Sequence, residues 1–222
     1  MFRVKQEKLI YGQTPQNGGA YTDRMDKIYT RFAKAYDGFI AVFPLWKKWL
    51  KSVLPYIRGE NLLDISFGPG YLFRCYPKNM RLFGLDYNVT MVQRAREKVK
   101  NWDVHVDIQK GNVEALPYED KSFDTVVNTM AFSGYPDGEK AIAQMLRVLR
   151  DDGVLLLLDY DYPANRNLLG YWMVRVMVKS GDIIKDIGKM LDAVPCTFER
   201  KVIGGFGSVQ LFIIKKQNWK GI

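Results

Sequence analysis

Two acids and two glycines are spaced as a nucleotide-like ligand would require. The stretch 61–71 predicts a short buried strand, with Asp64 near its end, that runs into a turn containing Gly68 and Gly70. A second apolar run ends in Asp86, eighteen residues after Gly68. Glycines let a backbone approach a ligand closely, and a carboxylate at a strand tip can accept from both hydroxyls of a ribose. We therefore expect a nucleotide-like ligand across the ends of neighbouring parallel strands.

Alternating strands and helices must position these groups. Short β-branched or leucine-rich runs alternate with amphipathic stretches, a pattern typical of a parallel sheet that is covered on both faces. Strands are expected at 62–65, 81–85, 104–110, 125–128 and 154–159, and helices at 71–75, 90–100 and 139–150. Before them, 21–35 and 39–57 read as helices, and after them 198–203 and 208–215 read as two strands joined through a glycine turn, which makes them antiparallel.

Four motifs in this order carry a family resemblance. They are 61–71, 82–86, 109–128 (a polar turn and the strand after it) and 145–159 (a helix, Asp-Asp-Gly and a strand). From about Met25 to Lys216 the chain resembles the class I S-adenosylmethionine-dependent methyltransferases, and most closely the branch that includes the ubiquinone/menaquinone-biosynthesis enzymes.

The resemblance implies one α/β domain over residues 1–222. Its fold would be the Rossmann-like methyltransferase fold, a doubly wound, seven-stranded, mostly parallel sheet with an antiparallel C-terminal hairpin and a helical lid. Residues 1–57 would form the N-terminal helical lid, 58–160 the cofactor-binding half, and 161–222 the substrate-side insertion and terminal hairpin. The hairpin argues against a plain dinucleotide-binding domain.

The resemblance also implies S-adenosyl-L-methionine as the cofactor, with Asp86 on its ribose. Tyr87 and Met91 would flank the adenine, the Asn112 side chain would read its exocyclic amine, and the Val113 amide would donate to a ring nitrogen. Other readings stay open at these positions: Asp86 also suits the N-terminus of the helix after it, Met91 suits a core, and Asn112 suits a turn after glycine.

Further residues are assigned to the methionine end of the cofactor. Asp64 would brace the first turn, whose backbone groups at Ser66, Gly68 and Gly70 would hold the methionine moiety. Ser66 stands where the family usually has glycine, and Phe67 stands where a small residue is usual, so Phe67 is expected to narrow the pocket. Asn128 and Thr129 would face the methionine end, and Tyr36 belongs to an N-terminal segment that would close over the cofactor.

The function that these motifs imply is methyl transfer from S-adenosylmethionine to an apolar or aromatic small molecule. Transfer by direct displacement needs no acid–base pair when the acceptor is already nucleophilic, and no catalytic base is evident. Aromatic and methionine side chains are expected to form the lid: Tyr36, Phe39, Phe43, Trp46, Tyr171, Trp172, Met173 and Met177. Two alternatives remain, an RNA methyltransferase and a non-catalytic cofactor-binding relative, the second suggested by the Ser66-Phe67 turn.

One segment, 168–179, is apolar nearly all round. It predicts either an ordinary buried helix or an apolar wall for a hydrophobic substrate, which could be delivered from a membrane surface. Residues before Tyr21 and the segment 163–195 are expected to become ordered when ligands bind, because a sulfonium site must open to admit ligands and close to exclude water.

Composition narrows the class of protein. The 222 residues carry a net charge of +9 from 33 basic and 24 acidic residues, but no dense basic block, so dispersed surface lysines and a small-molecule partner are expected rather than nucleic acid. Two cysteines and one histidine argue against a disulfide scaffold or a metal site. The charged N-terminus is unlike a signal peptide, so a cytoplasmic location is expected. Nothing in the sequence indicates the oligomeric state.

Overall fold

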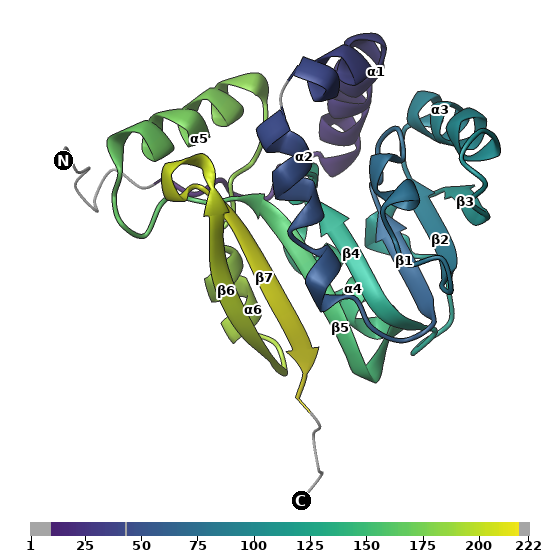
Figure 1. The fold of residues 1–222 in the computed structure, drawn as a ribbon. Helices are drawn as coiled ribbons and strands as arrows, with labels where there is room; N and C mark the ends of the chain where they lie inside the picture. The colour runs from purple at the N-terminus through teal and green to yellow at the C-terminus, as the bar shows by residue number, and fades with distance from the viewer. Residues whose placement is uncertain (1–9, 43, 218–222) are drawn as a thin grey trace, which may run out of the picture.

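A seven-stranded sheet with the strand order β3-β2-β1-β4-β5-β7-β6 forms the centre of the molecule (Figure 1). The computed structural model describes residues 10–42 and 44–217, and of 32–42 only the backbone. The strands are β1 (Asn61–Ile65), β2 (Arg81–Asp86), β3 (Val106–Lys110), β4 (Phe123–Thr129), β5 (Leu149–Tyr160), β6 (Cys196–Gly204) and β7 (Val209–Lys216).

The strand order reverses beside β1, which pairs in parallel with β2 on one side and β4 on the other. In an open α/β sheet this switch point opens a crevice at the carboxyl ends of the strands, where ligands bind. Strand β7 lies between β5 and β6 and is antiparallel to both. The predicted sheet and its C-terminal hairpin are therefore confirmed.

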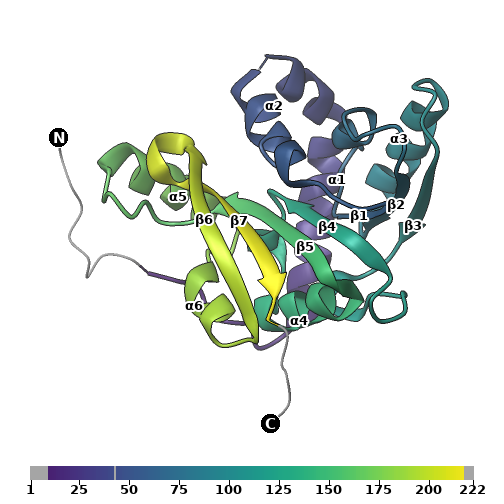
Figure 2. The ribbon, with the colours of Figure 1, turned by 60° about the horizontal axis from the view of Figure 1, so that its bottom comes forward.

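Helices cover both faces of the sheet (Figure 2). One face packs against α3 (Val89–Lys100) and the short 3-10 helix η3 (Tyr71–Arg74), and the other against α4 (Gly138–Val148) and α6 (Ile187–Asp192). Because both faces are covered, every residue of β5 from Val154 onward is buried.

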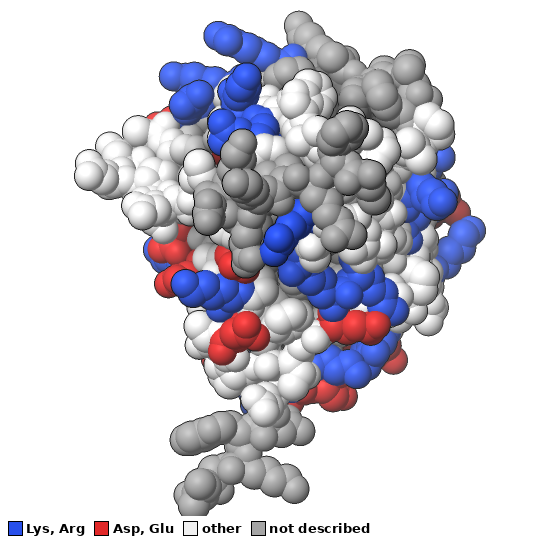
Figure 3. All heavy atoms as spheres, turned by 90° about the vertical axis from the view of Figure 1, so that its left-hand side faces the viewer, with Lys and Arg blue, Asp and Glu red and all other residues white. Residues whose placement is uncertain are grey.

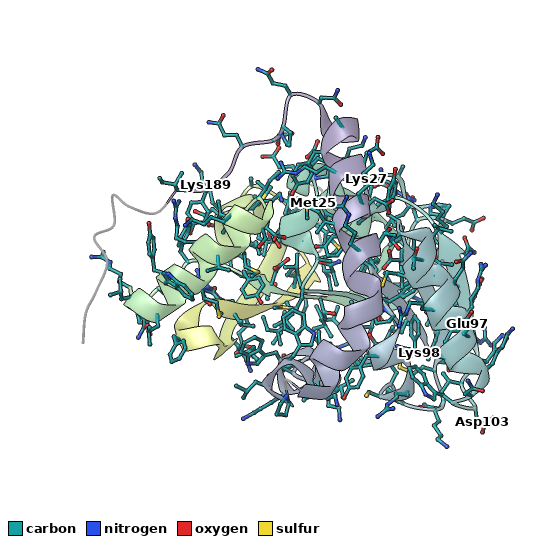
Figure 4. All side chains as sticks on the ribbon, turned by 90° about the horizontal axis from the view of Figure 1, so that it is seen from above. Met25, Lys27, Glu97, Lys98, Asp103 and Lys189 are labelled. Carbon is teal, nitrogen blue, oxygen red and sulfur yellow. The ribbon has the colours of Figure 1, made fainter. Side chains whose placement is uncertain are left out.

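Three helices lie above the carboxyl ends of the parallel strands: α1 (Gly18–Val42), α2 (Pro44–Lys51) and α5 (Leu168–Ser180). Figure 4 looks down on this end and shows α1 crossing over the sheet with Met25 on it. The Met25 side chain is only 4% exposed, so this part of α1 packs against the residues beneath it. No helix in the part of the chain described here is long and apolar enough to cross a membrane.

Several predicted elements need correction. The first helix starts earlier than 21–35 and runs as one element from Gly18 to Val42, and the helix expected at 71–75 is a single 3-10 turn. The reading of 168–179 as an ordinary buried helix is wrong. Only Gly170 and Val174 of α5 are buried, while Leu168, Leu169 and Trp172 are exposed.

Candidate cofactor and acceptor cavity

A cavity of about 250 Å³ lies at the switch point, beneath α1. Two parts of its wall come from different elements, and α1 and the segment 129–136 supply further wall residues. The loop end comes from the loops after β1, β2 and β3, and is formed by Gly68, Asp86, Tyr87, Asn112 and Val113. The helical end comes from α2, the tip of β5, α5 and the residue two positions after α5, and is formed by Trp46, Leu50, Tyr160, Met177 and Asp182.

Asp86 is fixed at the loop end by two backbone amides. Its Oδ2 accepts from the Gly68 N–H at 2.9 Å, and its Oδ1 accepts from the Asn88 N–H at 2.9 Å. Burial raises the pKa of Asp86 to about 7, and the two amides oppose that rise. A carboxylate oxygen has two lone-pair sites, so each oxygen can accept a further hydrogen bond from a ligand in the cavity.

The turn after β1 uses the left-handed backbone region three times, at Ser66 (φ 57°), Gly68 (φ 57°) and Gly70 (φ 77°). A serine there is strained by about 1–2 kcal/mol, which explains why glycine is usual at Ser66. A hydrogen bond of 2.7 Å joins the Ser66 hydroxyl to that of Tyr135. A Cβ built on Gly68 would meet nothing within 4 Å, so the backbone at Gly68 is open to the cavity.

The neighbouring Phe67 belongs to the cavity wall, but its ring is 8% exposed and packs on Phe73 with centroids 5.0 Å apart. Both rings lie over Gly84, where a Cβ would come within 2.9 Å of Phe67 and 2.7 Å of Phe73. The absence of a side chain at Gly84 in β2 therefore makes room for the aromatic residue in the turn.

Asp64 lies away from the cavity wall. Its side chain is 1% exposed and its Oδ2 accepts from the Tyr76 hydroxyl at 2.7 Å. Burial raises its pKa to about 7, and the hydrogen bond from Tyr76 lowers it less than burial raises it. The contact joins β1 to the segment after η3, and the expected bracing of the turn after β1 by Asp64 stays a prediction.

Asn112 and Val113 both lie in the loop-end wall, as expected. The Asn112 Oδ1 accepts from the Glu114 N–H at 2.9 Å, which caps a 3-10 turn and sets the direction of the side-chain amide. Tyr87 and Met91 also belong to the wall, with the Lys110 ammonium 5.7 Å from the centroid of the Tyr87 ring.

Asn128 and Thr129, at the end of β4, differ in position. Thr129 belongs to the cavity wall, whereas Asn128 lies behind it and is fully buried. The Asn128 amide donates to the Ile65 carbonyl at 3.0 Å and to the Tyr135 hydroxyl at 2.6 Å. Asn128 thus supports Tyr135, which reaches the cavity. The remaining predicted residue, Tyr36, has its side chain outside the described residues.

Asn88 links α1 to the loop end, a role that the sequence analysis missed. Its Oδ1 caps α3 by accepting from the Met91 N–H, and its amide donates to the Asp26 carboxylate at 2.8 Å and the Thr30 hydroxyl at 2.7 Å. The only sequence signal for Asn88 is its suitability as an N-cap. Its pairing with α1 joins residues 62 positions apart, so no local pattern could have predicted it.

A buried polar cluster lies under the helical end. The Ser133 N–H donates to Asp159 Oδ2 at 2.8 Å, and the Ser133 hydroxyl lies 3.1 Å from Asp182 Oδ1. Lys185 donates to the Phe132 carbonyl at 3.1 Å, and burial lowers its pKa to about 8. Burial raises the pKa of Asp182. Of this cluster, Ser133 and Asp182 reach the cavity.

The residues that were expected to form the lid do not all lie together in the structure. Trp46 and Met177 belong to the cavity wall. Tyr171 instead stacks on Tyr162 with centroids 5.5 Å apart, and Trp172 is 66% exposed. Met173 packs under the turn at Gly205. The side chains of Phe39 and Phe43 lie outside the described residues.

Comparisons with known proteins place this site in a family. A model described as a methyltransferase domain matches residues 63–157. The demethylmenaquinone methyltransferase of Listeria welshimeri is 30% identical over 151 residues, which cover 64% of this chain and 64% of that protein's own length. The ubiquinone/menaquinone biosynthesis C-methyltransferase UbiE of Klebsiella pneumoniae is 30% identical over 202 residues, 85% of this chain and 80% of that protein.

A solved structure agrees on the fold. A Haloferax volcanii protein, solved in complex with the Trm112 methyltransferase activator, has a TM-score of 0.70 at 18% identity and covers 86% of this chain and 98% of its own. The alignment to UbiE covers most of the chain. The chain therefore belongs to the class I S-adenosylmethionine-dependent methyltransferases, in the branch of the ubiquinone/menaquinone C-methyltransferases.

Proposed function

We propose that the protein transfers a methyl group from S-adenosylmethionine to a small aromatic molecule of the quinol type. The observation that carries this proposal is the two-part cavity. Its loop end offers a fixed carboxylate and backbone groups. Its helical end is mostly apolar or aromatic, because four of the five side chains that define it are Trp46, Leu50, Tyr160 and Met177. A polar, nucleoside-like ligand suits the first part and a flat apolar ring suits the second.

The loop end fits the cofactor of the family. Asp86 would accept from the ribose hydroxyls, and Asn112 with the Val113 amide would recognise the adenine. The open backbone at Gly68 leaves room for the methionine moiety, because no side chain fills the space above it. When bound there, S-adenosylmethionine supplies a methyl group on a positively charged sulfur. The side chains of α1 that reach the cavity, including Met25 and Tyr29, would exclude water.

Asp182 supports an acceptor that carries a hydroxyl. A phenol accepts a methyl group, at oxygen or at a neighbouring ring carbon, more readily once its hydroxyl has lost a proton. Asp182 is the carboxylate of the helical end, and burial raises its pKa, so it can hold a proton closer to neutral pH than an ordinary carboxylate. The hydroxyl of Ser133, 3.1 Å away, would orient it. We assign Asp182 the role of accepting that proton.

A label-transfer assay tests the function. The protein is incubated with S-adenosylmethionine labelled in the methyl group and, in separate reactions, with a demethylated naphthoquinol, total RNA and DNA. Label should enter the quinol. Incorporation mainly into RNA would overturn the proposal, and binding of S-adenosylhomocysteine without transfer to any acceptor would favour a non-catalytic relative.

A variant pair tests the role of Asp182. Asp182→Asn should lower kcat by at least about 100-fold and remove the acidic limb of the pH–rate profile, while cofactor affinity stays within about twofold. Asp192→Asn is the matched control, because Asp192 is an exposed acid at the end of α6 and outside the cavity wall. An Asp182→Asn enzyme with normal kcat would exclude Asp182 as the base and leave the proposed reaction untouched.

A further inference from the structure

Exposed apolar side chains gather at one end of the molecule. Among described residues, large apolar side chains that are about half exposed or more include Leu168 (47%), Leu169 (56%) and Trp172 (66%) on α5. Phe206 (59%) lies in the turn between β6 and β7, and Val202 (61%) lies near the end of β6. Leu45 (59%) lies on α2. Exposed large apolar groups that cluster rather than scatter mark an interaction surface.

Packing contacts join these residues into one strip. A Cβ at Gly170 of α5 would lie 2.8 Å from the Phe206 carbonyl, so the first turns of α5 rest against the β6–β7 turn. A Cβ at Gly204 would overlap Trp49, so α2 rests against the end of β6. A groove between α2 and β6, lined by Lys47, Lys48, Lys51 and Val202 among others, completes the connection.

The strip carries cations at its α2 side. Lys48 and Lys51 are exposed, and Lys47 is half-buried beside them. Lys201 of β6 pairs with Glu199 at 3.1 Å, which leaves the three lysines of α2 as an excess of positive charge. Figure 3 shows the face at the left of Figure 1, where Lys and Arg side chains gather at the top, and lie among Asp and Glu side chains across the middle.

The strip borders the cavity. On α2, Trp46 and Leu50 face the cavity while the lysines line the groove outside, and Tyr71 belongs to the walls of both. On α5, Met177 faces the cavity while Trp172 is exposed. The same two helices therefore carry the apolar lining of the cavity and the apolar surface outside it.

We infer that this strip docks the protein onto an anionic lipid bilayer. The side chains on α5 and Phe206 would enter the boundary between headgroups and acyl chains, and the lysines of α2 would contact anionic headgroups, as at other interfacial surfaces. The excess of lysines favours an anionic bilayer over a second copy, because a two-fold interface would bring the positive charge of α2 from both copies into one contact. A protein that docks at the membrane interface does not cross the bilayer, so this binding needs no membrane-crossing helix.

Vesicle flotation tests the inference with the full chain. Vesicles of phosphatidylcholine alone are compared with vesicles containing 30% phosphatidylglycerol, at low and high salt. The protein should float with the anionic vesicles, and binding should fall at least tenfold as salt rises, because exposed charges are screened.

Matched variants assign the binding to the strip. Trp172→Ala should lower the partition coefficient roughly fivefold, and Lys47→Glu with Lys48→Glu should lower it at least tenfold. Val89→Ala, at an exposed apolar residue on α3 (47%), and Lys100→Glu, at an exposed lysine at the end of α3, are the controls and should change binding less than twofold. Unchanged thermal unfolding would show that each variant is folded.

Three results would overturn the inference. The first is equal binding of neutral and anionic vesicles by all variants. The second is concentration-dependent dimerisation in sedimentation that Trp172→Ala abolishes, which would assign the strip to a second copy. The third is salt-sensitive binding of single-stranded RNA that requires Trp172 while vesicles do not bind.

Discussion

The two ends of the cavity are built in different ways. The loop end comes from residues 66–113, and each of its elements follows a strand of the sheet. Its key contacts are from side chains to nearby backbone, such as Asp86 on the Gly68 and Asn88 amides. The helical end draws on segments from Trp46 to Asp182, and its wall is mostly apolar.

The difference teaches where specificity can change. A loop end made by backbone amides and a strand-tip acid is fixed by the sheet, so it suits a ligand that stays the same across a family. A helical end made by side chains on separate helices can change its shape without disturbing the sheet, so it suits an acceptor that differs between relatives. Four predictions test this contrast, beginning with the largest expected effect.

Substitutions at Asp64 and at Asp86 should have different effects, because Asp64 is buried outside the cavity wall and Asp86 belongs to it. Burial raises the pKa of Asp64 from 3.8 to about 7. The folded state therefore keeps this proton up to about pH 7, whereas the unfolded state releases it near pH 4. The stability that the raised pKa provides is complete below pH 4 and is lost as pH rises to 7. Relative to Asp64→Asn, the wild type should lose on the order of 4 kcal/mol of unfolding free energy over this range.

Denaturant unfolding at pH 4, 5.5, 7 and 8 measures this difference. The slope with pH is compared rather than the absolute stability, because the new amide also changes hydrogen bonding around Asp64. Parallel curves for wild type and Asp64→Asn would contradict the assignment of a raised pKa to this group.

Asp86→Asn should weaken cofactor binding. The substitution removes a charged acceptor at the loop end, and a hydrogen bond to a charged group contributes about 1.5–3 kcal/mol, or roughly 10- to 150-fold in affinity. Calorimetry with S-adenosylhomocysteine gives the affinity. Asp64→Asn is the control, since Asp64 is as deeply buried but lies outside the cavity wall, and it should change the affinity less than threefold. Equal losses of cofactor affinity in both variants would contradict the different roles assigned to the two acids.

Met177→Ala should affect the acceptor and spare the cofactor. Removing this side chain from the helical end costs about 1.5 kcal/mol of apolar contact, so kcat/KM for the acceptor should fall about tenfold while the affinity for S-adenosylhomocysteine stays within twofold. Met173→Ala, one turn earlier on α5, is the control because Met173 packs under Gly205 and not in the cavity. A loss of cofactor affinity in Met177→Ala would mean that the two ends are not independent.

Gly68→Ala should block the loop end at a moderate cost in stability. The positive φ makes alanine unfavourable by about 1–2 kcal/mol, while its Cβ would meet no atom within 4 Å. The methyl group would stand in the cavity, so cofactor affinity should fall although the protein stays folded. Gly70→Ala is the comparison: its Cβ would lie 2.8 Å from the Phe73 ring, so it should lower the melting temperature more than Gly68→Ala does. The reverse order of melting temperatures would contradict this geometry.

Five of the residues predicted to bind the cofactor lie in the cavity wall: Gly68, Asp86, Asn112, Val113 and Thr129. Their contacts to the cofactor stay predictions. Asn128 lies near the end of β4, as predicted, but its side chain turns inward to hold Tyr135. A sequence position at the end of a strand does not decide which way the side chain faces when a tyrosine seven residues later can accept its hydrogen bond.

The sequence by itself determined the strand-forming segments and the positions of the loop-end residues, because these depend on local patterns: apolar runs, glycines where φ is positive, and acids at strand tips. The order of the strands joins distant segments and came from the structure. Only the tertiary structure decided the helical end. Trp46, Leu50 and Met177 have the spacing of ordinary core residues, and a core and a cavity wall require the same apolar periodicity. The contact that holds Asp182 at this end, with Ser133, joins residues 49 positions apart, and the contact of Asn88 with Asp26, which holds α1 over the loop end, joins residues 62 positions apart. Likewise, the apolar pattern of α5 is the same whether the helix is buried or exposed, and only its packing against the β6–β7 turn left Leu169 and Trp172 at the surface.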